Sequence, residues 1–211
     1  MMKSFRLFCL AAVAMALLTI PAMAGPLGKT IKGGISYAKI THDLSDFDYE
    51  MGIVVGLAMS YDLAPGFSLQ PELLYVQQGA KNEYEEMNEM GELIGSGDYI
   101  MDLDYIQIPV LAKVDLPVAG SVLPSIIAGP AIAFKINAEG TYEGSTGDVS
   151  ADLEDVNSTN LSLIVGLGLK LGAGPAGVNV EVRYNYGLSK IYDGPIDIQN
   201  RSIQGLVGFS F

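Results

Sequence analysis

The sequence has 211 residues, of which 49% are hydrophobic and 25 are glycine, and its formal net charge is −12. This excess of acid argues against nucleic acid or any other polyanion as a partner. The single cysteine, Cys9, precedes the region in which we expect a folded domain, so no disulfide is expected there.

Residues 1–24 have the pattern of a secretory signal peptide. Lys3 and Arg6 precede an apolar run over 7–20, and Ala22-Met23-Ala24 is a small-x-small cleavage site. The apolar run of about 14 residues is shorter than the ~20 that a membrane-spanning helix needs. We expect cleavage after Ala24, which leaves 25–211 as one folded domain.

The stretch 50–63 shows the clearest alternation in the chain. Its odd positions, from Met51 to Leu63, are all large and apolar, whereas its even positions, from Glu50 to Asp62, are mostly small or polar. A period of two is typical of a β-strand with a different environment on each face. The small, polar face suits a narrow interior, so we expect the bulky face to contact lipid.

Seven further segments alternate in a similar way. Ala64-Pro65-Gly66 predicts a tight turn, because proline fixes φ and glycine allows a left-handed residue. Pro124 and Pro130 interrupt one segment and predict bulges in it. The expected strands are 30–40, 50–63, 67–79, 99–115, 122–137, 160–172, 178–188 and 200–211.

Eight such strands predict an all-β protein, an eight-stranded antiparallel up-and-down transmembrane β-barrel. Closure of the barrel pairs every backbone group and leaves no strand edge in lipid. The connections 41–49, 80–98, 138–159 and 190–199 are longer than the other three, as is typical of external loops. We therefore expect the outer membrane of a Gram-negative bacterium, with both termini in the periplasm.

Aromatic residues expected to face lipid fall into two groups, which predicts girdles at the two membrane interfaces. The alternative explanation is that aromatic residues simply favour strands. The periplasmic group is Tyr61, Phe67, Phe209 and Phe211, and the external group is Tyr37, Tyr75, Tyr105, Phe134, Tyr184 and Tyr186.

A barrel of eight strands is just wide enough to be filled by its own side chains. Inward glycines such as Gly56 and Gly166 limit crowding, and inward charges must be paired because an unpaired buried charge is costly. We expect an interior polar network centred on Glu72, Glu181 and Arg183 that fixes strand register rather than conducting ions. Its expected members are Lys32, Glu72, Lys113, Lys135, Lys170, Glu181 and Arg183.

Most of the 24 acidic residues fall in the four long connections. Carboxylates are ligands that Ca²⁺ and Mg²⁺ prefer, but no run has the Asp-x-Asp-x-Asp-Gly spacing of a calcium loop, so solvated loops are the simpler interpretation. The segment 83–94 either forms a short helix or prolongs the flanking strands beyond the membrane. The weak metal candidates are Asp43, Asp46, Asp48, Glu83, Glu85, Glu86, Glu89 and Glu92.

Signals for catalysis are weak. His42 is the only histidine, and with Ser45 or Ser36 and a loop carboxylate it makes the one conceivable Ser/His/acid site. We find no Cys/His metal cluster and no phosphate-binding glycine loop. We therefore expect no catalytic residue and no cofactor, with a lipid-modifying outer-membrane enzyme and a soluble lipid-binding barrel as weaker alternatives.

The segments Phe67-Ser-Leu-Gln-Pro-Glu-Leu-Leu-Tyr-Val-Gln-Gln-Gly79, Tyr105-Ile-Gln-Ile-Pro-Val-Leu-Ala-Lys113 and Ala128-Gly-Pro130 resemble the PorT-like outer-membrane β-barrel family of Bacteroidetes. The resemblance extends from Gly33 to Phe211. It implies an eight-stranded barrel and, for a few members, a role in protein secretion, and it brings no catalytic residues. Phe209 and Phe211 also resemble the terminal signal that the outer-membrane assembly machinery reads.

Two functional classes remain open. The first is a non-enzymatic structural or surface-interaction protein with acidic external loops. The second is an accessory component of a secretion or envelope-assembly complex. Expected partners are outer-membrane lipid and lipopolysaccharide, the assembly machinery, and envelope or secretion proteins, but not nucleic acid.

Overall fold

The computed structural model describes residues 27–41, 48–87, 93–117, 122–143, 149–153, 157–172, 176–189 and 199–211. The expected signal peptide, 1–24, lies outside these ranges. No helix long and apolar enough to cross a membrane occurs in the described part of the chain.

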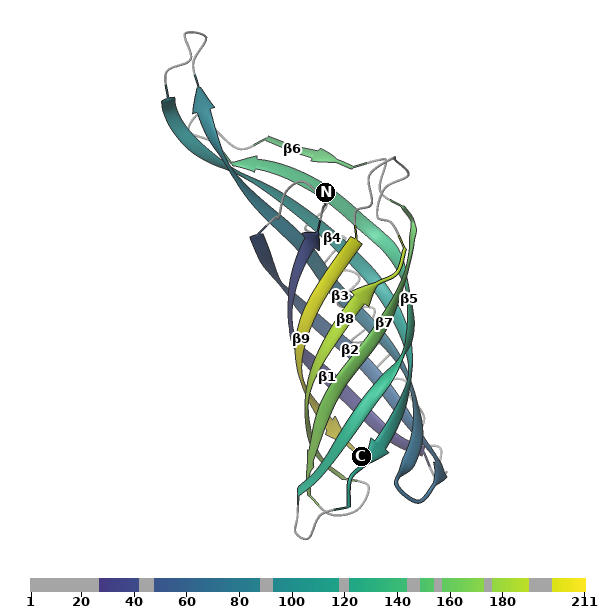
Figure 1. Ribbon diagram of the computed structural model, residues 1–211. Coiled ribbons are helices and arrows are strands. Elements are labelled where there is room, and N and C mark those ends of the chain that lie inside the picture. The colour runs from purple at the N-terminus through teal and green to yellow at the C-terminus, as the bar shows by residue number, and fades with distance from the viewer. Residues whose placement is uncertain are drawn as a thin grey trace.

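Eight antiparallel strands close into a ring, in the order β1-β2-β3-β4-β5-β7-β8-β9, and β6 pairs with β5 beyond it (Figure 1). The first and last strands close the ring, where the Lys29 and Phe211 backbones exchange hydrogen bonds of 3.3 and 2.9 Å. The strands are β1 (Leu27–Thr41), β2 (Asp48–Ala64), β3 (Phe67–Met87), β4 (Leu93–Asp115), β5 (Val122–Glu143), β6 (Val149–Asp152), β7 (Thr159–Leu171), β8 (Gly177–Gly187) and β9 (Gln199–Ser210). The predicted eight-stranded barrel is confirmed.

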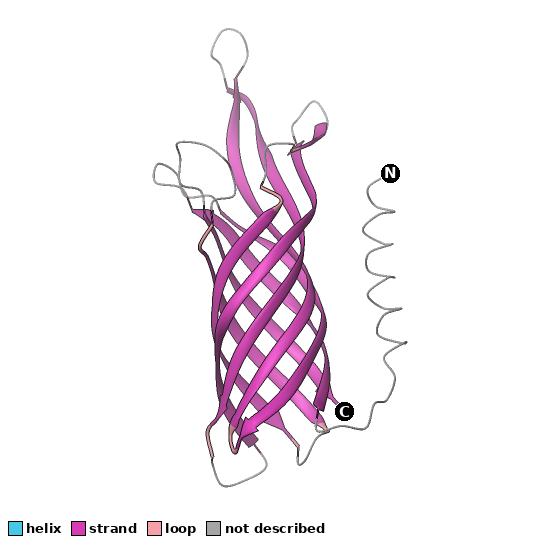
Figure 2. Ribbon diagram, turned by 90° about the vertical axis from the view of Figure 1, so that its right-hand side faces the viewer, coloured by secondary structure: helices cyan, strands magenta, loops and turns pink. Residues whose placement is uncertain are grey.

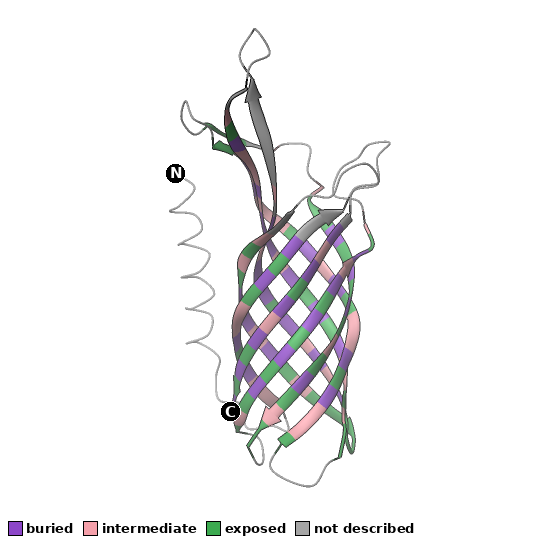
Figure 3. Cartoon of the chain, turned by 60° about the vertical axis from the view of Figure 1, so that its left-hand side comes forward, coloured by how far each residue is buried: buried purple, intermediate pink, exposed green. Residues whose placement is uncertain are grey.

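Buried and exposed residues alternate along the strands of the ring, most regularly in β7 and β8 (Figure 3). In β8 the exposed fraction is 55% for Val182 and 1% for the adjacent Arg183. In β2 it is 66% for Met51, which lies on the face predicted to contact lipid. An apolar exterior around a polar interior reverses the arrangement of a water-soluble barrel, because here lipid surrounds the protein.

Three strands extend beyond the ring and form a projecting sheet with β6 (Figures 1 and 2). It comprises 82–87 of β3, 93–104 of β4, 137–143 of β5 and β6. Within the connections expected over 80–98 and 138–159, the described residues 80–87, 93–98, 138–143 and 149–152 are strand. The described residues of 83–94, which are 83–87 and 93–94, prolong the flanking strands and do not form a helix. The alternation that identifies a membrane strand stops at the lipid boundary, whereas backbone pairing continues past it.

The prediction of bulges at Pro124 and Pro130 is wrong. The β5–β7 register runs unbroken from Val122 to Phe134. A proline removes one ladder hydrogen bond but inserts no extra residue, and only an inserted residue makes a bulge. The register shift between β4 and β5 lies instead at Asp104 and Tyr105.

Two tyrosines assigned to the external girdle do not belong to it. Tyr75 and Tyr105 are each 1% exposed, and Tyr105 shares the inward positions of Gln107 and Leu111. The Tyr75 hydroxyl accepts a hydrogen bond of 3.2 Å from Gln77 Nε2. Seven of the other girdle residues are 38–56% exposed on the outer surface; they are Tyr37, Tyr61, Phe67, Phe134, Tyr184, Phe209 and Phe211.

Candidate functional site

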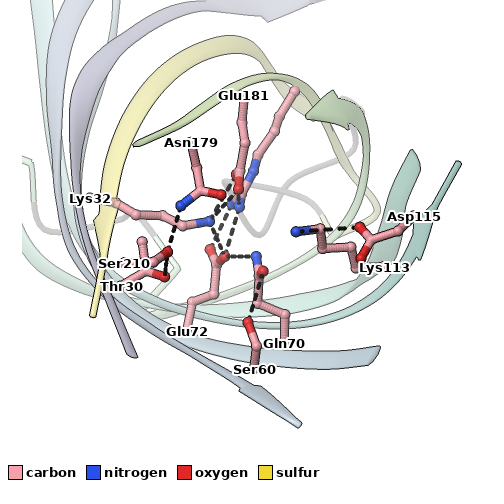
Figure 4. A network of polar contacts seen from close by, with 11 residues as sticks. Thr30, Lys32, Ser60, Gln70, Glu72, Lys113, Asp115, Asn179, Glu181 and Ser210 are labelled. Atoms are coloured by element: carbon pink, nitrogen blue, oxygen red, sulfur yellow. Dashed lines mark hydrogen bonds and ion pairs between the residues drawn. The ribbon is translucent and has the colours of Figure 1, made fainter. Parts of the chain in front are cut away.

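The centre of the barrel holds four charged side chains from three strands, three of which are labelled in Figure 4 as Lys32, Glu72 and Glu181. Lys32 comes from β1, Glu72 from β3, and Glu181 and Arg183 from β8. Glu181 and Arg183 are two residues apart in β8, and both point inward because every second residue of a strand lies on the same face. Each is at most 5% exposed.

Two cations and two carboxylates alternate within this central charge cluster. Lys32 Nζ donates to Glu72 Oε1 at 2.9 Å and to both Glu181 oxygens at 2.7 and 2.8 Å. Arg183 donates to Glu72 through Nη1 at 2.6 Å and Nη2 at 2.7 Å, a bidentate pair, and Nη2 also donates to Glu181. Such pairing offsets the cost of removing four charges from water.

Glycine provides the room for these long side chains. Lys32 is flanked in the ring by Gly56 of β2 and Gly208 of β9, and Arg183 faces Gly166 of β7. A Cβ at Gly208 would lie 3.2 Å from Lys32 Cγ, and one at Gly166 would lie 3.0 Å from Arg183 Cγ. The small residues expected to limit crowding therefore stand beside the charges.

The three other lysines expected in the polar network lie elsewhere. Lys113 Nζ is 3.6 Å from Asp115 Oδ1, at the end of the barrel where the chain terminates. Lys170 is the second-last residue of β7. Lys135 lies in β5, opposite Tyr105 and next to the register shift between β4 and β5. The sequence gives the inward position of each lysine but not its depth, because depth depends on strand stagger.

Uncharged polar side chains fill the barrel on both sides of the central charge cluster. Toward the terminal end, Ser210 Oγ bonds Thr30 at 2.8 Å and Asn179 Nδ2 at 2.6 Å, and Gln70 donates to Glu72 at 2.7 Å. Toward the other end, a cavity of about 10 Å³ is just large enough for one water molecule. It is lined by Gln78, Gln107, Ala133, Asn160, Ser162, Asn185, Gly187 and Asn200.

None of the expected metal candidates has a described side chain. Asp43, Asp46, Glu89 and Glu92 lie outside the described residues, whereas Asp48, Glu83, Glu85 and Glu86 are placed only as backbone positions in β2 and β3. The described residues contain no group of three acidic, histidine or cysteine side chains arranged for a metal ion. The metal assignment therefore stays a prediction.

The residues of the conceivable Ser/His/acid site are only partly described. His42 and Ser45 lie outside the described residues, and Ser36 is 0% exposed inside the barrel. A serine buried there has no access to the ester bonds of membrane lipid.

The projecting sheet joins the ring through a small apolar cluster. It comprises Met101, Leu103, Tyr105, Ala133 and Ala138, with Tyr99 and Leu153 packed against it. The Tyr99 and Tyr142 rings lie 4.5 Å apart between centroids, and Tyr142 is 52% exposed. The projecting sheet is thus anchored at its base by packing that the alternation of the sequence did not indicate.

Burial, and then the neighbouring Tyr142, raises the pKa of Tyr99 above its usual value of 10.0. Because the pKa of Tyr99 is higher in the folded than in the unfolded state, the packing of its neutral hydroxyl contributes to stability below about pH 10. This contribution is lost as the pH rises through the folded-state pKa. The difference in absorbance at 295 nm between wild type and Tyr99→Phe reports the ionisation of Tyr99, and we expect its midpoint above pH 10. In the Tyr142→Phe background we expect this midpoint at a lower pH. A difference titration at or below the usual tyrosine value would contradict the packing of Tyr99.

An eight-stranded antiparallel ring with a lipid-facing exterior and a polar core defines a transmembrane β-barrel. The family model for the outer membrane protein beta-barrel domain matches residues 21–193. The chain therefore belongs to this family, and the protein is located in the outer membrane of a Gram-negative bacterium.

Several solved structures are similar at low identity. Neisserial surface protein A (NspA) is 16% identical, with a TM-score of 0.47, 87% of this chain covered and 97% of that chain. Ail of Yersinia pestis, in complex with the heparin analogue sucrose octasulfate, is 16% identical, with a TM-score of 0.44 and coverages of 88% and 99%. The outer membrane enzyme PagL is 18% identical, with a TM-score of 0.36 and coverages of 82% and 97%. These likenesses are too weak to bear on activity, and no curated protein matches.

Proposed function

We propose that the protein is a non-enzymatic outer-membrane barrel whose interior is closed by its own side chains and whose projecting sheet is a surface for interactions outside the cell. The observation that carries this proposal is the central charge cluster. Its four charges come from strands on opposite sides of the ring and meet at 2.6–2.9 Å, which leaves no path for hydrated ions between them.

The proposed external side of the barrel is the end that carries the projecting sheet. The turn between β2 and β3 at the opposite end is tight, with Gly66 at φ 75°, as expected of a short periplasmic turn. Phe211 lies at that same end, where we assign Phe209 and Phe211 to recognition by the assembly machinery. Their rings lie 6.5 Å apart on the exterior and are 56% and 51% exposed.

The finer assignment to the PorT-like group is part of this proposal and supports a second candidate, an accessory component of a secretion or envelope complex. A specific observation favours it. The projecting sheet ends in the four-residue strand β6, and strand edges are sites where a partner adds a strand. A lipid-modifying enzyme that uses Ser36 as its nucleophile is disfavoured by the burial of Ser36.

Conductance and protease cleavage test the first proposal together. Purified protein in planar lipid bilayers should give no stable open channel, because the interior is filled. Protease applied to intact cells should cut within 80–98 or 138–159, and the protected barrel should migrate faster before boiling than after it. A steady ionic current would contradict the closed interior. Cleavage only at the turns of the opposite end would contradict the orientation.

A further inference from the structure

Arg201 is a cation on the lipid-facing side of the barrel. It precedes Ser202, which is 1% exposed inside the barrel, and it shares the outward positions of Ile203 and Val207, which are 44% and 56% exposed. It is the third residue of β9, at the end away from the C-terminus. The guanidinium thus lies at the rim of the apolar band, where long basic side chains reach the headgroup layer.

Arg201 contacts an aromatic ring rather than a carboxylate. Its guanidinium carbon lies 5.0 Å from the centroid of the Tyr186 ring, and these residues are register partners in β9 and β8. Its Nε has no hydrogen-bond partner, and Arg201 takes part in none of the ion pairs between described side chains. The side chain is therefore held in place by Tyr186 while its charge has no described counterion.

Two further tyrosines flank this pair. Tyr184 of β8 and Tyr37 of β1 lie on either side of β9 and are both register partners of Ile203, two residues deeper in the barrel than Arg201. They are 39% and 46% exposed. We call Tyr37, Tyr184, Tyr186 and Arg201 the Arg201 patch.

We propose that the Arg201 patch binds the phosphorylated saccharide headgroup of a glycolipid in the outer leaflet. A guanidinium presents parallel donors that match a phosphate, and a tyrosine contacts a sugar through its ring and its hydroxyl. Arg201 would take the phosphate and the tyrosines the sugar. The outer-leaflet location rests on the orientation in the proposed function.

Lipid retention in nanodiscs tests this site. Wild type, Arg201→Gln, Arg201→Lys and Lys29→Gln are placed in phosphatidylcholine nanodiscs with a small fraction of bis-phosphorylated lipid A or of its dephosphorylated form. Lipid retained after extraction in mild detergent is counted by native mass spectrometry. Lys29 is the matched control, because it occupies a lipid-facing position of β1 at the opposite end of the barrel.

We expect wild type and Lys29→Gln to retain the phosphorylated form, Arg201→Gln to lose about fivefold or more of it, and Arg201→Lys to lose less. Equal retention by wild type and Arg201→Gln, or equal retention of the two lipids by wild type, would overturn the proposal. Displacement of lipid A by millimolar inorganic phosphate would also overturn it, since the site would then be a simple phosphate site.

Folding and orientation are controlled separately. The heat-dependent gel mobility of each variant shows that its barrel is formed. Both leaflets of the nanodisc contain the glycolipid, so the result does not depend on orientation, which protease cleavage of intact cells tests. Failure of the patch and failure of the proposed function are therefore distinguishable.

Discussion

Replacing Arg183 by Met should reduce the free energy of unfolding by about 3–5 kcal/mol, because it leaves two buried carboxylates with Lys32 as their remaining cation. Arg183 is 1% exposed and makes a bidentate pair with Glu72. The measurement is urea unfolding in lipid vesicles, followed by the change in gel mobility between the folded and unfolded forms.

The double variant Glu72→Met, Arg183→Met separates charge pairing from simple loss of packing. It removes one cation and one carboxylate and leaves Lys32 paired with Glu181 at 2.7 Å. We expect it to be more stable than either single variant, since no unpaired charge remains. Additive losses in the double variant would contradict the interpretation that the four charges act as one neutral cluster.

Replacing Gly34 by Ala should impair closure of the ring between β1 and β9. A Cβ at Gly34 would lie 1.9 Å from the Gly205 carbonyl oxygen and 2.9 Å from Leu206 Cα. These are backbone atoms of the adjacent strand, which cannot move aside as a flexible side chain does. We expect a loss of stability of about 1–3 kcal/mol or more, and slower appearance of the heat-modifiable form on refolding.

Gly205→Ala is the matched control for Gly34→Ala. It lies in the same pair of strands, but its nearest neighbour would be Ile35 Cγ1 at 3.9 Å, which is ordinary contact. Alanine there should be neutral or slightly stabilising, since it reduces the entropy of the unfolded chain. Similar refolding of the two variants would show that the close approach of β1 and β9 does not limit closure.

Local patterning accounts for the strands that cross the membrane. The expected segment 50–63 is β2 over 48–64, and the expected 160–172 is β7 over 159–171. A lipid exterior around a polar interior imposes the same alternation on every such strand, so a single sequence carries a strong signal. The projecting sheet gave no such signal, since it lies beyond the lipid and its alternation is not imposed.

The sequence by itself determined the barrel, the number of strands in its ring, and the inward position of Lys32, Glu72, Glu181 and Arg183. These follow from residue order and a period of two. Only the tertiary structure decided that these four side chains meet and that Lys113 pairs with Asp115 rather than with the central charge cluster. It also decided that the Arg201 guanidinium packs over the Tyr186 ring. Such contacts depend on the stagger of strands around the ring, which is fixed when the whole sheet closes and leaves no local mark in the sequence.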